Sequence, residues 1–284
     1  MKKLLGILVL GLLWCNAVIA VTFNEEKDKL PITPESIGEW DYTCKKEDFI
    51  KYVATIEGCI ALIKLGKIDK SKKKLVVFLH GDRKAKSDYP IKKDSNFSKA
   101  IKDEKENINF FYLARPGHKF VGRTRSPGKY KNYEVLNKRI ERVVFKKGWE
   151  SMRLISQALY RLKEFYKPDE LIVIGMSGGS IDISVISGKV PGLIDKGIMG
   201  GCDCHMQKRQ FWISGEFIKT IPPETELILI TGKDDDVINR NTHYVGEAKK
   251  LGKNVEEHIV KGEHSVTSTL LKHDGLEILK EALK

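Results

Sequence analysis

Short continuous apolar runs alternate along the chain with longer stretches in which apolar residues recur at helical spacing. Continuous runs are typical of strands buried on both faces, and the longer period is typical of amphipathic helices. From about residue 53 onward, strands are predicted over residues 59–65, 74–79, 108–113, 171–174, 194–199, 227–231 and 255–260. Helices are predicted over residues 95–106, 149–166, 179–187, 242–251 and 266–283, with Gly148 interrupting the pattern before the second of them.

This alternation predicts an α/β fold with a mostly parallel central sheet covered by helices on both faces. The chain of 284 residues is long enough for one large domain of this kind. We expect that single domain to cover residues 21–284. Residues 21–52 are its least regular part.

The first twenty residues differ from the rest and predict a signal peptide over residues 1–20. Lys2 and Lys3 precede an apolar stretch, and residues 18–20 (Val-Ile-Ala) form a site for signal peptidase. The apolar stretch is too short for a transmembrane helix. We therefore expect an exported protein, periplasmic or secreted, with no integral membrane segment after cleavage. The alternatives are an uncleaved anchor and a lipoprotein signal at Cys15, against which Trp14 argues because lipoprotein signals carry a small residue there.

The sequence is basic, with 50 lysines and arginines against 38 acidic residues and a net charge of +12 at pH 7. The excess is spread along the chain, which indicates a solvated lysine-rich surface. Electrostatic association with anionic envelope surfaces is the alternative use of this charge. A nucleic-acid partner is not expected, because no recognition module accompanies the basic residues.

Four cysteines remain after residues 1–20, and an even number in an exported protein favours disulfides. Pairing of Cys44 with Cys59 and of Cys202 with Cys204 is the simplest of three connectivities. Residues 202–205 (Cys-Asp-Cys-His) also suggest a metal site. Two thiolates this close need further ligands, and oxidation would remove them. We expect no metal.

Polar or glycine-rich turns follow four of the predicted strands. They are residues 80–82 (HGD), 175–179 (GMSGG), 232–236 (GKDDD) and 261–265 (KGEHS). Ligands of parallel sheets bind outside the carboxyl ends of the strands, so these turns predict one shared site.

The glycine–serine turn in residues 172–181 (IVIGMSGGSI) predicts an activated serine. Ser177 would sit on a sharp strand-to-helix turn, with Gly175 and Gly179 at the positions where side chains would clash. The helix that follows aims its first amides at the reaction centre. A serine hydroxyl needs a base and an orienting carboxylate, which later turns supply as His264 and residues 234–236. A phosphate-binding loop is rejected, because neither the lysine nor the glycine spacing it requires is present.

The order of these motifs resembles the α/β-hydrolase fold family, whose signature is a Gly-x-Ser-x-Gly elbow followed by an acid and then a histidine. The resemblance covers roughly residues 55–284 by segment order. It implies Ser177 as nucleophile, His264 as general base and Asp235 as the acid, three residues after a glycine that closes a strand. Asp234 and Asp236 remain alternatives to Asp235.

The same resemblance implies an oxyanion hole made of backbone N–H groups. One would come from Gly178, and the second from Asp82 in the turn after His80 and Gly81. That turn lacks the His-Gly-Gly-Gly sequence of many lipases and esterases, which leaves the second donor open.

Basic residues in the loops near the predicted site suggest a preference for an anionic substrate. Arg83, Arg115 and His118 are the substrate-binding candidates, and a solvated basic face is the alternative interpretation. Residues 202–226 allow only a short lid.

The sequence thus predicts an exported serine hydrolase that cleaves a carboxylic ester through an acyl-enzyme, without a cofactor. The alternatives are a serine peptidase acting on small peptides and a non-catalytic hydrolase-like binding protein.

Overall fold

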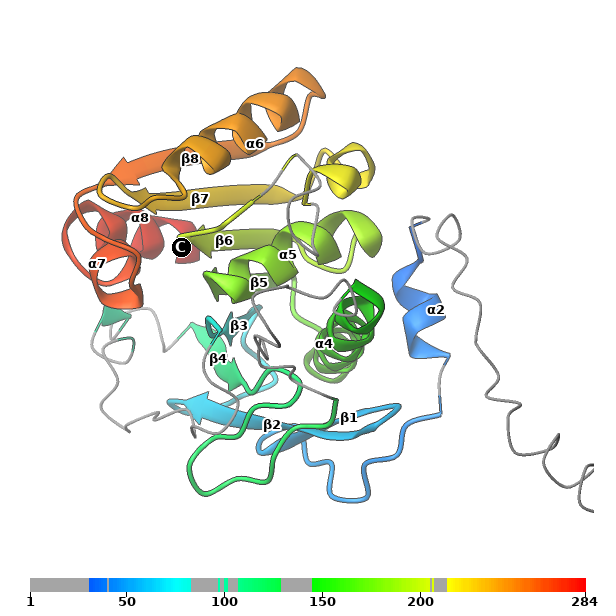
Figure 1. Cartoon of the computed structure of the whole chain (residues 1–284). Coiled ribbons are helices and arrows are strands. Elements are labelled where there is room, and N and C mark those ends of the chain that lie inside the picture. The colour runs from blue at the N-terminus through cyan, green and yellow to red at the C-terminus, as the bar shows by residue number, and fades with distance from the viewer. Residues whose placement is uncertain are drawn as a thin grey trace, which may run out of the picture. The chain divides into compact units, whose positions relative to one another are not determined.

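The strands of the described residues form one eight-stranded sheet, in the order β1-β2-β4-β3-β5-β6-β7-β8 (Figure 1). The computed structural model describes residues 31–39, 41–82, 97, 100–101, 107–128, 145–204, 206 and 214–284. Pro31–Lys284 is one unit, divided from Met1–Leu30. The predicted signal peptide, residues 1–20, lies outside the described residues.

Six strands of the sheet run parallel and two form an antiparallel edge. The parallel strands are β3 (Lys74–Leu79), β4 (Ile108–Leu113), β5 (Glu170–Met176), β6 (Lys196–Gly200), β7 (Glu226–Gly232) and β8 (Val255–Val260). The hairpin of β1 (Tyr52–Thr55) and β2 (Gly58–Leu65) adds to β4 in antiparallel orientation. The mostly parallel α/β sheet predicted from the apolar runs is therefore confirmed.

Helices cover both faces of the sheet. They are α2 (Pro34–Gly38), α4 (Phe145–Tyr166), α5 (Gly178–Lys189), α6 (Ile238–Lys250), α7 (Val266–Leu270) and α8 (His273–Leu283), with the 3₁₀ helix η4 (Ser214–Thr220). Along β3, Leu75 and Val77 pack on the face of α4 and α5, whereas Val76 and Phe78 pack on the face of α8. Such burial on both faces is what produces a continuous apolar run in a strand.

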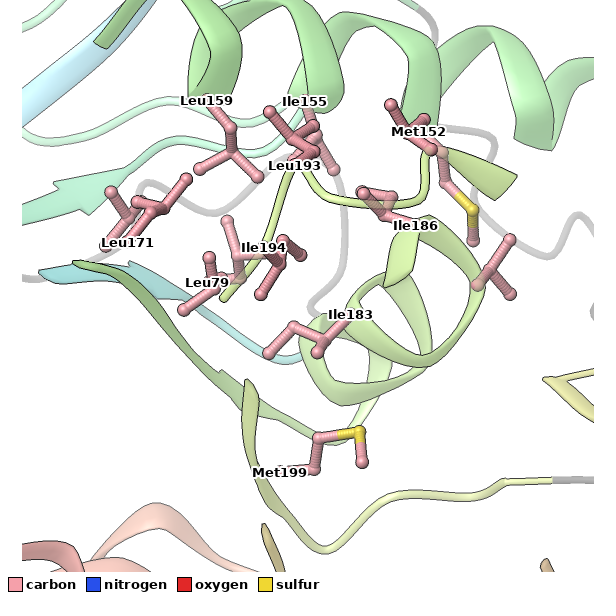
Figure 2. Close-up of a cluster of buried hydrophobic side chains, with 14 of the residues drawn as sticks. Leu79, Met152, Ile155, Leu159, Leu171, Ile183, Ile186, Leu193, Ile194 and Met199 are labelled. Carbon is pink, nitrogen blue, oxygen red and sulfur yellow. The ribbon is translucent and has the colours of Figure 1, made fainter. Parts of the chain in front are cut away.

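The core between α4, α5 and the sheet fixes the helix that begins at the predicted site. Met152, Ile155 and Leu159 of α4 meet Ile183 and Ile186 of α5 in a fully buried cluster (Figure 2). Burial of a side chain of this size contributes about 1.5–3 kcal/mol. The cluster therefore holds the start of α5 in a fixed position relative to β5.

The structure corrects two of the predicted helix boundaries. Helix α4 begins at Phe145 and runs through Gly148, because a helical glycine costs only about 1 kcal/mol and the helix buries a long apolar stripe. The predicted closing helix is instead two helices, α7 and α8. Its chain turns through an extended Lys272 and a left-handed His273, whose φ is 50°. The helix predicted over residues 95–106 lies largely outside the described residues.

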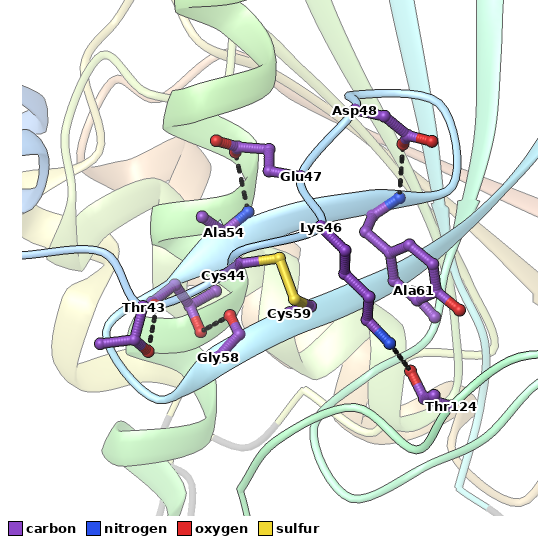
Figure 3. Close-up of a disulfide and its surroundings, with 12 residues drawn as sticks. Thr43, Cys44, Lys46, Glu47, Asp48, Ala54, Gly58, Cys59, Ala61 and Thr124 are labelled. Atoms are coloured by element: carbon purple, nitrogen blue, oxygen red, sulfur yellow. Dashed lines mark hydrogen bonds between the residues drawn. A yellow bond between two sulfur atoms is a disulfide. The ribbon is translucent and has the colours of Figure 1, made fainter.

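Two disulfides join the four cysteines by the local pairing. Cys44 is bonded to Cys59 and Cys202 to Cys204 (Figure 3 shows the first). Around the first, the Glu47 carboxylate accepts a hydrogen bond from the Ala54 N–H at 2.8 Å. The Cys202–Cys204 disulfide lies in the loop after β6.

Among the described residues, no helix is both long enough and apolar enough to cross a membrane.

Candidate active site

The turn between β5 and α5 has the tight backbone that the glycine–serine sequence predicts. Ser177 has φ 52° and ψ −117°, a conformation that side-chain-bearing residues rarely adopt. A Cβ at Gly175 would lie 2.6 Å from the carbonyl carbon of Gly179. Only glycine allows the two backbone segments to approach this closely.

Hydrogen bonds on both sides fix the position of Ser177. Its N–H donates to the Gly200 carbonyl of β6 at 2.9 Å, and its own carbonyl accepts from the N–H groups of Ser180 and Ile181 at 2.9 and 3.1 Å. The Ser180 hydroxyl donates to the same Gly200 carbonyl at 2.9 Å. The half-buried Ser177 is therefore held at the first turn of α5, where the N–H groups carry partial positive charge.

Asp235 and His264 form a hydrogen bond at the carboxyl ends of β7 and β8. The imidazole Nδ1 lies 2.8 Å from the carboxylate Oδ2, and the Asp235 side chain is 0% exposed whereas His264 is 37% exposed. The second carboxylate oxygen accepts from the Val237 N–H at 3.1 Å. Asp234 and Asp236 are exposed. Among the three adjacent aspartates, Asp235 is therefore the one paired with the histidine.

This pairing determines which ring nitrogen can act as a base. A carboxylate is an acceptor, so it favours the neutral imidazole tautomer that carries its proton on Nδ1. The Nε2 of His264 is then the basic nitrogen. Its ring is partly open to solvent, which is compatible with proton exchange.

Backbone hydrogen bonds bring the two loops together. The N–H of Lys233 donates to the Val260 carbonyl at 2.8 Å, and that of Asp234 donates to the Gly262 carbonyl at 3.1 Å. The hydroxyls of Ser268 and Thr269 both donate to the Glu263 carbonyl at 2.8 Å. These contacts hold the residues that flank Asp235 and His264.

The turn after β6 binds the serine backbone and lies close to the histidine ring. A Cβ at Gly201 would lie 3.1 Å from Nδ1 of His264, and Gly201 directly follows Gly200, which binds the Ser177 N–H. Ser177 and His264 therefore contact consecutive residues of one turn. This turn was given no role on the basis of sequence, and the signal that could have revealed it is the Gly-Gly pair at the end of an apolar run.

The turn after β3 lies against the start of α5. A Cβ at Gly81 would lie 3.3 Å from the Cβ of Ser177, and a Cβ at Gly178 would lie 2.6 Å from Cγ of Asp82. Gly178 and Asp82, the residues predicted to supply the oxyanion hole, are thus neighbours beside Ser177. The absence of a side chain at Gly178 is what allows this approach.

Arg115, predicted to bind substrate, is paired with two carboxylates. Its Nε donates to Oδ2 of Asp182 and its Nη1 to Oδ1 of Asp82, both at 2.6 Å, and its side chain is only 12% exposed. Burial and the neighbouring Asp82 charge raise the pKa of Asp182 to about 6, although Arg115 opposes them. Burial alone would raise the pKa of Asp82, but the Arg115 charge outweighs it and the pKa is lowered. A guanidinium neutralised in this way is a poor partner for an anionic substrate.

His118, the second predicted substrate contact, is buried. Its Nδ1 donates to the Pro116 carbonyl at 3.2 Å, and its ring packs edge-on against His80 at a centroid distance of 4.5 Å. Burial and the nearby charge of Arg115 lower its pKa from 6.5 to about 4, so the ring is neutral at pH 7. This packing argues against contact with substrate. Arg83, the third candidate, lies outside the described residues.

Two of the residues that suggested a metal site, Cys202 and Cys204, form a disulfide. Their thiolates are therefore not available as ligands. Within the described part of the chain, no group of three or more histidine, cysteine, aspartate or glutamate side chains is placed to hold a metal ion. His205 lies outside the described residues.

Solved structures resemble this chain far more in fold than in sequence. An esterase of Pyrococcus furiosus superposes with a TM-score of 0.59 at 16% identity, covering 89% of this chain and 95% of its own. A Bacillus cereus carboxylesterase gives 0.53 at 12% identity, covering 79% and 93%. An α/β hydrolase from a deep-sea metagenome gives 0.50 at 15% identity, with the same coverage of both chains. No protein-family model and no curated protein sequence matches the chain.

Proposed function

Because the chain has the α/β-hydrolase fold, we propose that it is an exported serine hydrolase that cleaves carboxylic esters. The hydrogen bond between Asp235 and His264 carries the proposal. The Asp235 side chain is fully buried and the His264 side chain is partly exposed. Both lie at the edge of the sheet where Ser177 follows β5 on a strained turn. A buried acid that orients a histidine near such a serine is the arrangement a hydrolytic triad needs.

The reaction proceeds in two halves through an acyl-enzyme. Ser177 Oγ attacks the ester carbonyl carbon while Nε2 of His264 takes the hydroxyl proton, and the Asp235 carboxylate stabilises the resulting imidazolium. The tetrahedral intermediate collapses, and its alkoxide leaves as an alcohol with the proton from His264. Water then attacks the acyl group on Ser177, His264 again acts as base, and the carboxylic acid is released.

The negative charge of each tetrahedral intermediate forms on the former carbonyl oxygen. The N–H groups of Gly178 and Asp82 are the donors proposed for it, since both residues lie beside Ser177. Removal of one such donor costs about 10²–10³ in kcat in other serine hydrolases. The first turn of α5 adds its partial positive charge.

Export is the proposed location, and the two disulfides support it. Cys44–Cys59 and Cys202–Cys204 use every cysteine that follows residue 20, and disulfides persist in oxidising compartments. Fractionation of cells that express the full chain, with mass spectrometry of the mature N-terminus, tests this proposal. A cytosolic protein that retains residues 1–20 would contradict it.

Labelling with a fluorophosphonate probe tests the chemistry. The mature, oxidised protein is incubated with the probe beside Ser177→Ala and His264→Ala variants, and turnover of p-nitrophenyl butyrate is measured in parallel. We expect rapid labelling and turnover that both variants lose. A folded wild-type protein that is neither labelled nor active would favour the hydrolase-like binding protein instead. Cleavage of a peptide p-nitroanilide in preference to the ester would favour a peptidase.

A further inference from the structure

The Arg115 side chain connects three segments next to the proposed oxyanion hole, namely the loop after β4, the turn after β3 and helix α5. It follows β4, and its guanidinium contacts the turn after β3 and the first turns of α5. Nη1 donates to the His80 carbonyl at 3.1 Å and to the Asp82 carboxylate at 2.6 Å, and Nε donates to Asp182 of α5 at 2.6 Å. One side chain thus ties the turn of residues 80–82 to the helix that begins after Ser177.

A second contact locks the same turn through its histidine. The Arg115 N–H donates to Nε2 of His80 at 3.2 Å, and the His80 Nδ1 lies 2.8 Å from the Gly81 carbonyl. An Nε2 that accepts requires the proton on Nδ1, which therefore donates to Gly81. Both the backbone and the side chain of Arg115 thus fix the backbone of residues 80 and 81.

The carboxylate of Asp82 creates an electrostatic problem at this place. It lies against the Cα of Gly178, whose N–H is one of the proposed oxyanion donors. A bare negative charge there would repel the oxyanion that forms in the transition state. The guanidinium of Arg115 supplies the compensating charge within hydrogen-bond distance.

Asp182 holds the guanidinium from the other side. Its side chain is 6% exposed and lies within α5, so it is carried by the same rigid helix as Gly178. Arginine has the planar fork that can serve two carboxylates and a carbonyl together, whereas lysine carries a single point charge. The pair Arg115–Asp182 therefore sets the distance between the turn and the helix.

We propose that Arg115, held by Asp182, is a positioning residue for hydrolysis. It places the backbone N–H groups of Asp82 and Gly178 at the oxyanion and offsets part of the charge of the Asp82 side chain. This inference rests on the proposed function and adds to it a group that touches neither substrate nor nucleophile. It predicts an effect on the transition state rather than on substrate binding.

The test compares Arg115→Met, Arg115→Lys and Asp182→Asn with the wild type, using p-nitrophenyl butyrate and the fluorophosphonate probe. We expect Arg115→Met to lower kcat and the labelling rate by about 100-fold, as a displacement of about 1 Å in reacting groups does, with KM little changed. Arg115→Lys and Asp182→Asn should show smaller losses of the same kind. If Arg115→Met fails to fold, these two variants carry the test.

Two controls separate positioning from general loss of stability. Arg161→Met removes a similar fork, since Arg161 binds Glu47 through Nε at 2.8 Å and Nη2 at 2.5 Å. Its guanidinium packs over Tyr42 and Phe49 and not against the turns around Ser177. It should lower thermal stability and leave kcat unchanged. Addition of Asp82→Asn to Arg115→Met should restore part of the lost kcat, because the uncompensated charge is then gone.

The outcomes distinguish this inference from the proposed function. An active, labelled wild type with unchanged kcat in folded Arg115→Met and Asp182→Asn would overturn the positioning role alone. A rise in KM at constant kcat would also overturn it, because it would indicate direct substrate binding by Arg115. A wild type that neither labels nor turns over would overturn the proposed function, and this inference with it.

Discussion

The Nδ1 of His264 lies 2.8 Å from Oδ2 of Asp235, and the carboxylate that orients the ring is completely buried. Two neighbours of that acid, Asp234 and Asp236, are exposed. The three adjacent aspartates therefore offer a test with built-in controls. We expect Asp235→Asn to lower kcat by about 10⁴-fold, because an amide favours the wrong imidazole tautomer.

Asp234→Asn and Asp236→Asn are the matched controls for this prediction. Each removes the same charge from the same loop, and each should retain near-wild-type kcat with p-nitrophenyl butyrate. Loss of activity in either variant at a level equal to that of Asp235→Asn would contradict the assignment of the acid.

Gly201→Ala should displace His264. The new Cβ would lie 2.9 Å from Cε of Met176 and 3.1 Å from the imidazole Nδ1, at a backbone φ of 51°. Gly252→Ala is the control, since Gly252 has a φ of 67° and no neighbour within 4 Å of its added Cβ. Both variants should lose about 1–2 kcal/mol of stability from backbone strain, and Gly201→Ala more than Gly252→Ala because Met176 must also shift, as measured by urea denaturation. Only Gly201→Ala should lose kcat, and equal activity in the two would contradict contact at Gly201.

His118 should make the protein less stable in acid. Its folded pKa of about 4 lies below the usual 6.5, so the unfolded chain binds the proton more readily. The contribution of neutral His118 to the free energy of unfolding is complete above pH 6.5. It is lost as the pH falls toward 4, and the loss is about 3 kcal/mol at most.

Urea denaturation at pH 7 and pH 4.5 checks this, beside His118→Asn, whose amide can still donate to Pro116. The acid loss of stability should be smaller in the variant. Asp182 has the opposite effect on stability, because its pKa is raised to about 6 and the folded protein therefore binds its proton more readily than the unfolded chain. Asp182 is present in both proteins, so its effect cancels in the comparison. An equal loss in wild type and variant would show that His118 does not titrate as expected.

The two disulfides should differ in their contribution to stability. Cys44–Cys59 closes a separation of 15 residues, for which the chain-entropy relation gives about 3 kcal/mol. Cys202–Cys204 spans a separation of 2 and restricts the unfolded chain much less. Double alanine variants of each pair, compared by urea denaturation, check this. A greater loss from the Cys202–Cys204 variant would contradict it.

The positions of several strands could be predicted from the sequence, because they depend on residues close together in the chain. The runs at 74–79 and 108–113 coincide with strands β3 and β4, because burial on both faces imposes a continuous apolar sequence. Residues 255–260 also coincide with a strand, β8, but this edge strand exposes Glu256 and Ile259. The order of the strand-end turns also predicted that Asp235 and His264 lie close together, and the two are hydrogen-bonded. The carboxyl ends of parallel strands all lie at the same edge of the sheet, so the turns that follow them are brought together.

Long-range polar contacts could not be predicted in this way. Arg115 and Asp182 are 67 residues apart, and nothing in either local sequence records that they pair. Arg115 was therefore assigned to the substrate on charge alone. The break between α7 and α8 was missed for a related reason, since residues 266–283 keep an apolar period across the turn.

The left-handed backbone of Ser177 bears on the stability of the fold. A non-glycine residue with φ 52° and ψ −117° carries a strain of the order of 1–3 kcal/mol, and glycine would relieve it. Ser177 therefore lowers the stability of the fold relative to glycine at the same position. The hydroxyl is the group that this strained position carries and that glycine could not supply.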